Sequence, residues 1–136
     1  LHEGFYDTDT FENTHSWQKI DRSVLSITAA GDNTCQPHVG CNYQGSAPSI
    51  RAMTFDLMPT GGKYLMFLHT VEIDHDFLGS LDTTDCDACV NPSRWMRASV
   101  LAYLDAVVRK LPAAAAWIAE GTINAASGKA VTWRKK

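Results

Sequence analysis

The stretch Tyr64-Leu65-Met66-Phe67-Leu68 decides the fold of this chain. It lacks a clean alternation of apolar and polar residues, and glycine or charged residues bound it. A short run of this kind is typical of a strand buried on both faces, as in a parallel sheet. Val24-Leu25-Ser26-Ile27-Thr28 has the same character earlier in the chain. We therefore expect two neighbouring parallel strands.

The segment between the two runs predicts a helix. It begins at Pro48, a residue suited to a helix start, and its apolar residues recur at helical spacing. These residues are Ile50, Met53, Leu57 and Met58. The chain from Val24 to Leu68 then forms a β-α-β crossover.

A long helix is predicted after the second strand. Asn91 and Pro92 give an N-cap and a first-turn signal. One apolar stripe follows, made of Met96, Val100, Leu104, Val107, Val108 and Leu111. Pro112 ends this helix and opens an alanine-rich helical piece, which closes at Gly121.

Together these elements predict a single α/β unit with a partial parallel sheet and flanking helices. Residues 1–21 form an irregular lead-in, residues 22–121 the core and residues 122–136 a tail. Two parallel strands alone leave both faces and an edge of the sheet open. We expect a second copy in a homodimer, or a separate N-terminal segment, to cover them.

Composition excludes two classes of partner. The 136 residues are 45% hydrophobic and 20% charged, with a formal net charge of −3, which is ordinary for a globular domain. The only basic run is Arg134-Lys135-Lys136, so no nucleic-acid partner is expected. No apolar stretch approaches the roughly 20 residues of a membrane helix, so no membrane span is expected.

Two residues that could form an acid–base pair follow the predicted strands. Asp32 comes directly after the first strand, and His75 lies just beyond the second. Ligands and catalytic groups collect at the carboxyl ends of parallel strands. Because neighbouring strands lie about 4.8 Å apart, loops from their ends can bring a carboxylate against an imidazole. Asp32 could also be a turn or helix-cap residue, and His75 a surface histidine beside Asp74 and Asp76.

The order of strand, Gly-Asp, loop and helix, then "MPTGGKYLMFLHTVEIDHDFLG" and "MRASVLAYLDAVVRKLPAAAAWI", resembles a known family. It looks like the C-terminal region of esterase- or dienelactone-hydrolase-like α/β-hydrolases, over roughly residues 16–118. The resemblance implies that Asp32 is the triad acid and His75 the triad base. It also implies a small acyl substrate such as a carboxylic ester, with no cofactor.

The chain departs from that family in one large respect. The family's nucleophile lies on a G-x-S-x-G turn upstream of the acid and histidine, and no such turn occurs here. The expected function is therefore a portion of a serine-hydrolase-type enzyme, with the serine on another segment and little activity alone. The competing hypothesis is a non-catalytic binding or assembly module derived from a hydrolase fold.

Four cysteines flank the same predicted site. Cys35 and Cys41 follow Asp32, and Cys86 and Cys89 follow His75. Two local disulfides, Cys35 with Cys41 and Cys86 with Cys89, are the leading interpretation, while free thiols or one shared zinc ion stay open. A thioredoxin-like role is disfavoured, because such a motif normally opens a helix and this one is expected in an acidic loop. Paired cysteines would favour a periplasmic or secreted protein.

Overall fold

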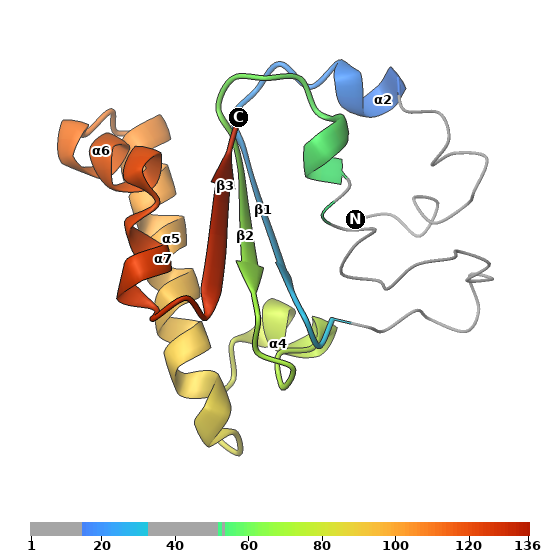
Figure 1. The fold of residues 1–136 in the computed structure, drawn as a ribbon, viewed down its shortest axis with the longest axis vertical. Coiled ribbons are helices and arrows are strands. Elements are labelled where there is room, and N and C mark those ends of the chain that lie inside the picture. Colours follow the sequence, from blue (N-terminus) through green and yellow to red (C-terminus); the bar gives the residue numbers. More distant parts are fainter. Residues whose placement is uncertain (1–14, 33–51, 53) are drawn as a thin grey trace.

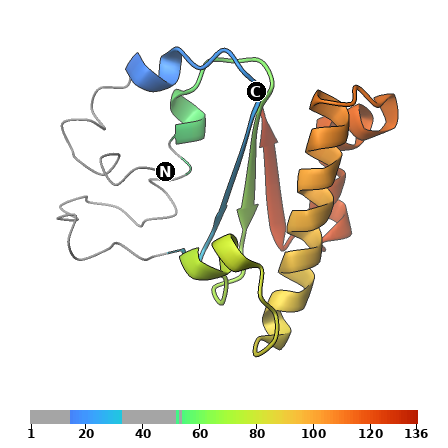
Figure 2. The same cartoon turned by 180° about the vertical axis from the view of Figure 1, so that it is seen from behind.

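The computed structural model describes residues 15–32, 52 and 54–136. Figure 1 shows the strands and helices of this part, and Figure 2 shows them from behind. In chain order they are α2 (His15–Gln18), β1 (Val24–Ala29), β2 (Lys63–Leu68), α4 (His75–Ser80), the 3-10 turn η3 (Asp87–Cys89), α5 (Val90–Val107), α6 (Pro112–Glu120), α7 (Thr122–Ala126) and β3 (Val131–Lys135). The expected α/β class with flanking helices is confirmed.

The sheet is mixed, with strand order β1-β2-β3. β1 and β2 are parallel, and their register runs from Val24 opposite Lys63 to Ala29 opposite Leu68. β3 is antiparallel to β2 and covers its other edge. The expected parallel pair is therefore present, but the sheet as a whole is not purely parallel.

The central strand β2 is buried on both faces, as its unbroken apolar run predicts. Tyr64, Met66 and Leu68 face the helices α5, α6 and α7, which lie together on one side of the sheet (Figure 1). Leu65 is also buried, on the opposite face. Phe55, from the segment between β1 and β2, is buried as well, and its ring stacks under the Arg134 guanidinium of β3.

The crossover between β1 and β2 is helical in the part that the structure describes. Residues 54–57 are helical, and Met58 is buried. Pro48, Ile50 and Met53 lie outside the described residues. Of the expected irregular lead-in, the described part contains one helical turn, α2.

Residues 122–136, expected as a tail, contain α7 and β3, and β3 completes the described sheet. Val131 and Trp133 point into the core, and the intervening residue Thr132 does not. This alternation is the period of a half-buried strand. α7 packs beside β3, where the side chains of Asn124 and Ser127 accept the backbone N–H groups of Trp133 and Val131.

The long helix is present as α5, but its expected apolar stripe is wrong as a core face. Met96 is buried, whereas Val100, Leu104, Val108 and Leu111 are exposed. The side toward the core carries Met96, the aromatic residues Trp95 and Tyr103, and small residues such as Ser93 and Ser99. The side that carries Val100 and Leu104 faces outward.

No helix in the described ranges is both long and apolar enough to cross a membrane.

Candidate functional site

Asp32 lies at the carboxyl end of β1 and is completely buried. The Thr28 hydroxyl donates a hydrogen bond to its carboxylate at 3.2 Å. The backbone N–H of Asp32 donates to the carbonyl of Ala29 at 3.1 Å, which turns the chain sharply after the strand. A buried carboxylate needs such partners because leaving water is costly. The acid is thus held in place at the edge where sequence reasoning placed it.

Gly31 brings the two strand-end loops into backbone contact. A Cβ built on Gly31 would lie 2.7 Å from the carbonyl oxygen of Ile73 and would overlap the carbonyl of Val71. Only a residue without a side chain permits this approach. The turn that carries Asp32 therefore packs directly on the segment that leads from β2 to His75.

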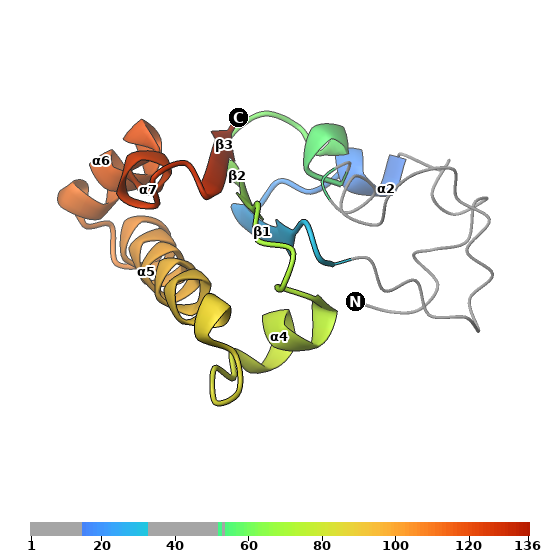
Figure 3. The same ribbon diagram turned by 60° about the horizontal axis from the view of Figure 1, so that its bottom comes forward.

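His75 is the first residue of α4, which lies beyond the carboxyl ends of β1 and β2 (Figure 3). The Asp74 side chain caps this helix by accepting the backbone N–H of Phe77 at 2.8 Å. The cap fixes where α4 begins and so fixes the backbone position of His75. The side chain of His75 lies outside the described part.

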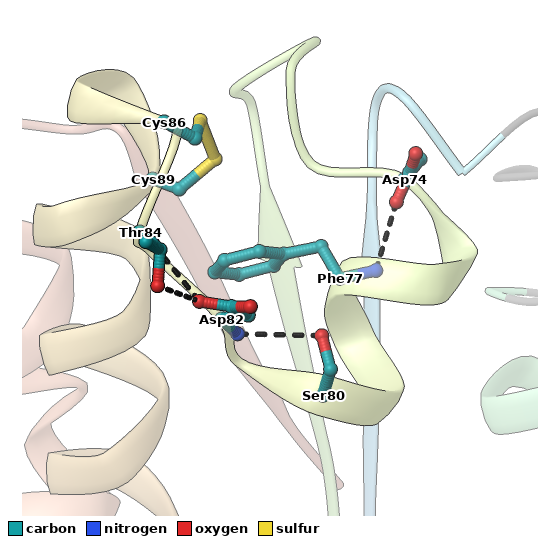
Figure 4. The surroundings of a disulfide bond; sticks show 7 residues. All are labelled: Asp74, Phe77, Ser80, Asp82, Thr84, Cys86 and Cys89. Atoms are coloured by element: carbon teal, nitrogen blue, oxygen red, sulfur yellow. Dashed lines mark hydrogen bonds between the residues drawn. A yellow bond between two sulfur atoms is a disulfide. The ribbon is translucent and has the colours of Figure 1, made fainter.

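A disulfide joins Cys86 and Cys89, whose Cα atoms are 5.2 Å apart (Figure 4). Cys35 and Cys41 lie outside the described residues, so the structure does not test their pairing. Within the described ranges, no group of three or more histidine, cysteine or carboxylate side chains is placed to hold a metal ion.

The position of this disulfide corrects one expectation. Cys86 and Cys89 do not lie in a loop apart from any helix, because Cys86 is the N-cap of η3 and η3 runs directly into α5. Cys89 is itself the N-cap of α5. The Cys-x-x-Cys motif therefore opens the longest helix of the described chain, although the segment before it is α4 rather than a strand.

A shallow acidic hollow lies beside the disulfide, between α4 and the start of α5. Its lining residues are Glu72, Asp74, Phe77, Ser80, Asp82, Asp85, Cys86 and Cys89. Asp82 is fixed there by Thr84, whose hydroxyl and backbone N–H donate to one carboxylate oxygen at 2.7 and 2.9 Å (Figure 4). These hydrogen bonds lower the pKa of Asp82, because they stabilise the ionised carboxylate.

Sequence reasoning missed this hollow and the contact of Gly31 with the second loop. The spacing Asp82-Thr83-Thr84 is a signal for the first, because aspartate often accepts hydrogen bonds from the residue two positions later. For the contact with the second loop, the signal in the sequence is the glycine directly before Asp32. Comparison of the chain with protein-family models, with curated proteins and with solved structures finds no match.

Proposed function

We propose that this chain supplies the acid and the histidine of a serine-hydrolase triad that acts on carboxylic esters or related acyl substrates. Asp32 is the acid, His75 is the base, and the serine comes from a segment outside these 136 residues. The carboxylate would orient the imidazole and stabilise the imidazolium, while the imidazole takes the proton of the serine.

The observation that supports the proposal most directly is the backbone contact of Gly31 with Val71 and Ile73. It brings the turn of the buried Asp32 against the loop that ends at His75. Parallel strands set side by side, each followed by one member of the pair, fit the arrangement that an acid and a histidine of a triad require. The absence of a G-x-S-x-G turn from the sequence is the reason for assigning the nucleophile elsewhere.

The pairing can be tested on the chain itself by NMR of its imidazole nitrogens. If the Asp32 carboxylate faces His75, it holds the pKa of that ring above its ordinary value, and Asp32→Asn lowers it. His75→Gln assigns the signal, and Asp74→Asn serves as the matched control on the helix cap. A His75 pKa that responds to Asp74→Asn but not to Asp32→Asn contradicts the pairing.

The enzymatic part of the proposal has its own test with p-nitrophenyl esters. Residues 1–136 alone should show no saturable turnover, because His75 has no positioned hydroxyl to activate. A catalytic assembly that contains the serine segment should lose about 10⁴-fold in kcat on Asp32→Asn, the size of effect seen when a triad acid is neutralised. Turnover by the chain alone that disappears with His75→Ala would contradict the assignment of the nucleophile to another segment.

One observation supports the second candidate, a binding or assembly module. Leu101 and Leu104 of α5 and its C-cap residue Val108 recur at a spacing of three and four residues, and they are 59, 45 and 67% exposed. An apolar seam of this spacing is typical of a helix that packs against another helix. Arg94 and Arg97 are also exposed, and they lie nearer the N-terminus of the same helix.

These charges favour one kind of occupant for the seam. A second copy would add its own arginines to the interface, whereas a separate amphipathic helix with glutamates beside its leucines would neutralise Arg94 and Arg97. We therefore propose an acidic amphipathic helix of a separate segment as the partner.

The occupant is tested with two designed heptad peptides that carry leucine on the seam and either glutamate or lysine beside it. The glutamate peptide should bind, and Leu104→Glu should abolish the binding. Equal binding of the lysine peptide would overturn the acidic partner, and a dimer mass by light scattering that Leu104→Glu converts to a monomer would assign the seam to a second copy.

A further inference from the structure

We propose that the Cys86–Cys89 disulfide is a redox site that exchanges with thiols of peptide or protein substrates whose cysteines lie beside basic residues. The sequence motif is Cys-x-x-Cys, and the structure places it at the start of an 18-residue helix. Cysteines in this position are the usual participants in thiol–disulfide exchange. The proposal is independent of the hydrolase assignment, because it uses none of its residues.

The two cysteines differ in their exposure to solvent. Both line the hollow, but Cys86 is half-buried, whereas Cys89 is only 2% exposed. We expect an incoming thiolate to reach Cys86 first, with Cys89 as the leaving group.

The helix provides a reason for Cys86 to act as the reactive thiol. Cys86 is the N-cap residue of η3, and η3 continues into α5, so Cys86 precedes the first turn of this helical segment, at the positive end of its dipole. The dipole favours a thiolate at this end, against the opposing charge of the carboxylates in the hollow, and so favours Cys86 as the leaving group in the last step.

The negative charge of the hollow indicates which class of substrate it would attract. Glu72, Asp74, Asp82 and Asp85 line the same hollow as the disulfide and give it negative charge, and Phe77 adds one apolar surface. Like charges repel an acidic substrate and attract a basic one, most strongly at low salt. Lysine or arginine beside the reacting cysteine is therefore the complementary feature.

The reaction balances without a further reagent. A substrate thiolate attacks the Cys86 sulfur, forming a mixed disulfide while the Cys86–Cys89 bond breaks, and Cys89 leaves as a thiolate and takes a proton. A second substrate thiolate then attacks the substrate sulfur, and Cys86 leaves and is protonated. The substrate dithiol loses two electrons and two protons, and the two cysteines gain them.

The experiment uses the folded 136-residue chain and two reduced dithiol peptides that differ only in flanking lysines or glutamates. We expect the lysine peptide to be oxidised about tenfold faster at low ionic strength, with the difference shrinking as salt is added. Given the same lysine peptide in its oxidised, disulfide form, Cys89→Ser should accumulate a mixed disulfide that peptide mapping locates at Cys86, because the Cys86 thiolate displaces one peptide sulfur as a thiol. Cys86→Ser should accumulate no mixed disulfide at Cys89.

Three outcomes would overturn the proposal. The disulfide could resist the peptides and dithiothreitol until denaturant is added, which would make it purely structural. Both serine variants could trap equal amounts of peptide, or the two peptides could react at equal rates. Because the first and third readouts use the unaltered chain, they decide the question even if a serine variant does not fold. None of these results bears on the proposed esterase function, which is tested separately.

Discussion

The side-chain oxygen of Asn124 accepts the backbone N–H of Trp133 at 2.6 Å, so a helix residue closes the outer edge of the last strand. Ser127 does the same for Val131 two residues earlier in that strand, at 3.0 Å. Unpaired N–H groups on an edge strand attract other chains. In the part of the chain that the structure describes, one side chain of α7 and that of its C-cap residue thus take the place of a neighbour strand on the outer edge of β3.

Asn124→Ala is expected to lower the free energy of unfolding by about 1–3 kcal/mol, because it leaves the buried N–H of Trp133 without its acceptor. Urea unfolding followed by tryptophan fluorescence measures the change. Asn91→Ala, at an exposed position of α5, is the matched control and should change stability by less than about 0.5 kcal/mol. Equal effects of the two variants would contradict a role for Asn124 in closing the edge.

Gly31→Ala is expected to destabilise the fold by about 3 kcal/mol, because its Cβ would meet the backbone carbonyls of Val71 and Ile73, and backbone yields less than a side chain. Gly128→Ala is the control, since nothing lies within 4 Å of its Cβ and only its positive φ of 62° opposes a side chain. That strain costs about 1 kcal/mol. Thermal unfolding compares them, and a smaller loss at Gly31 would contradict the close contact.

The strands and the long helix could be predicted from the sequence because their signals are local. The two apolar runs gave the parallel pair, and Asn91-Pro92 gave the start of α5 to within a turn. β3 could not be predicted in the same way, because only Val131 and Trp133 of its residues point inward and basic residues follow them. A short edge strand of this kind resembles a solvated tail until its partner strand is known.

The buried face of α5 shows why periodicity alone can mislead. Val100 and Leu104 recur at helical spacing, and so do Met96, Ser99 and Tyr103 on the side of the helix that packs against the core. Periodicity reports that a helix has two faces, but the space beside the sheet decides which face fits. In the candidate site, likewise, Asp32 could be placed from strand order, whereas the contact of Gly31 depends on the path of a loop.

Met96→Ala and Leu104→Ala together test which face of α5 is buried. Met96 is 4% exposed, and its truncation should cost about 2–5 kcal/mol because it leaves a cavity in the core. Leu104 is 45% exposed, and its truncation should cost less than about 1 kcal/mol. Chemical denaturation of both variants gives the comparison. The reverse order of the two losses would show that the stripe expected from the sequence faces the core after all.

The last prediction concerns alkaline pH and the packed pair of Tyr64 and Tyr103. Their ring centroids are 5.7 Å apart at an interplanar angle of 74°, an edge-to-face arrangement. Burial raises the pKa of Tyr64 above its ordinary value of 10.0. Burial also raises the pKa of Tyr103, and the neighbouring Tyr64 adds to that rise through charge repulsion.

The sign follows from proton linkage. The folded chain holds these protons more tightly than the unfolded chain, so their contribution to stability is complete below pH 10 and is lost as the pH rises above it. We expect the free energy of unfolding to fall between about pH 9 and about pH 11, and to fall less steeply in Tyr64→Phe. Lysine titration acts equally on both proteins, so the difference in slope isolates the contribution of Tyr64. Identical slopes would mean that the Tyr64 phenol titrates in the folded chain as it does in the unfolded one.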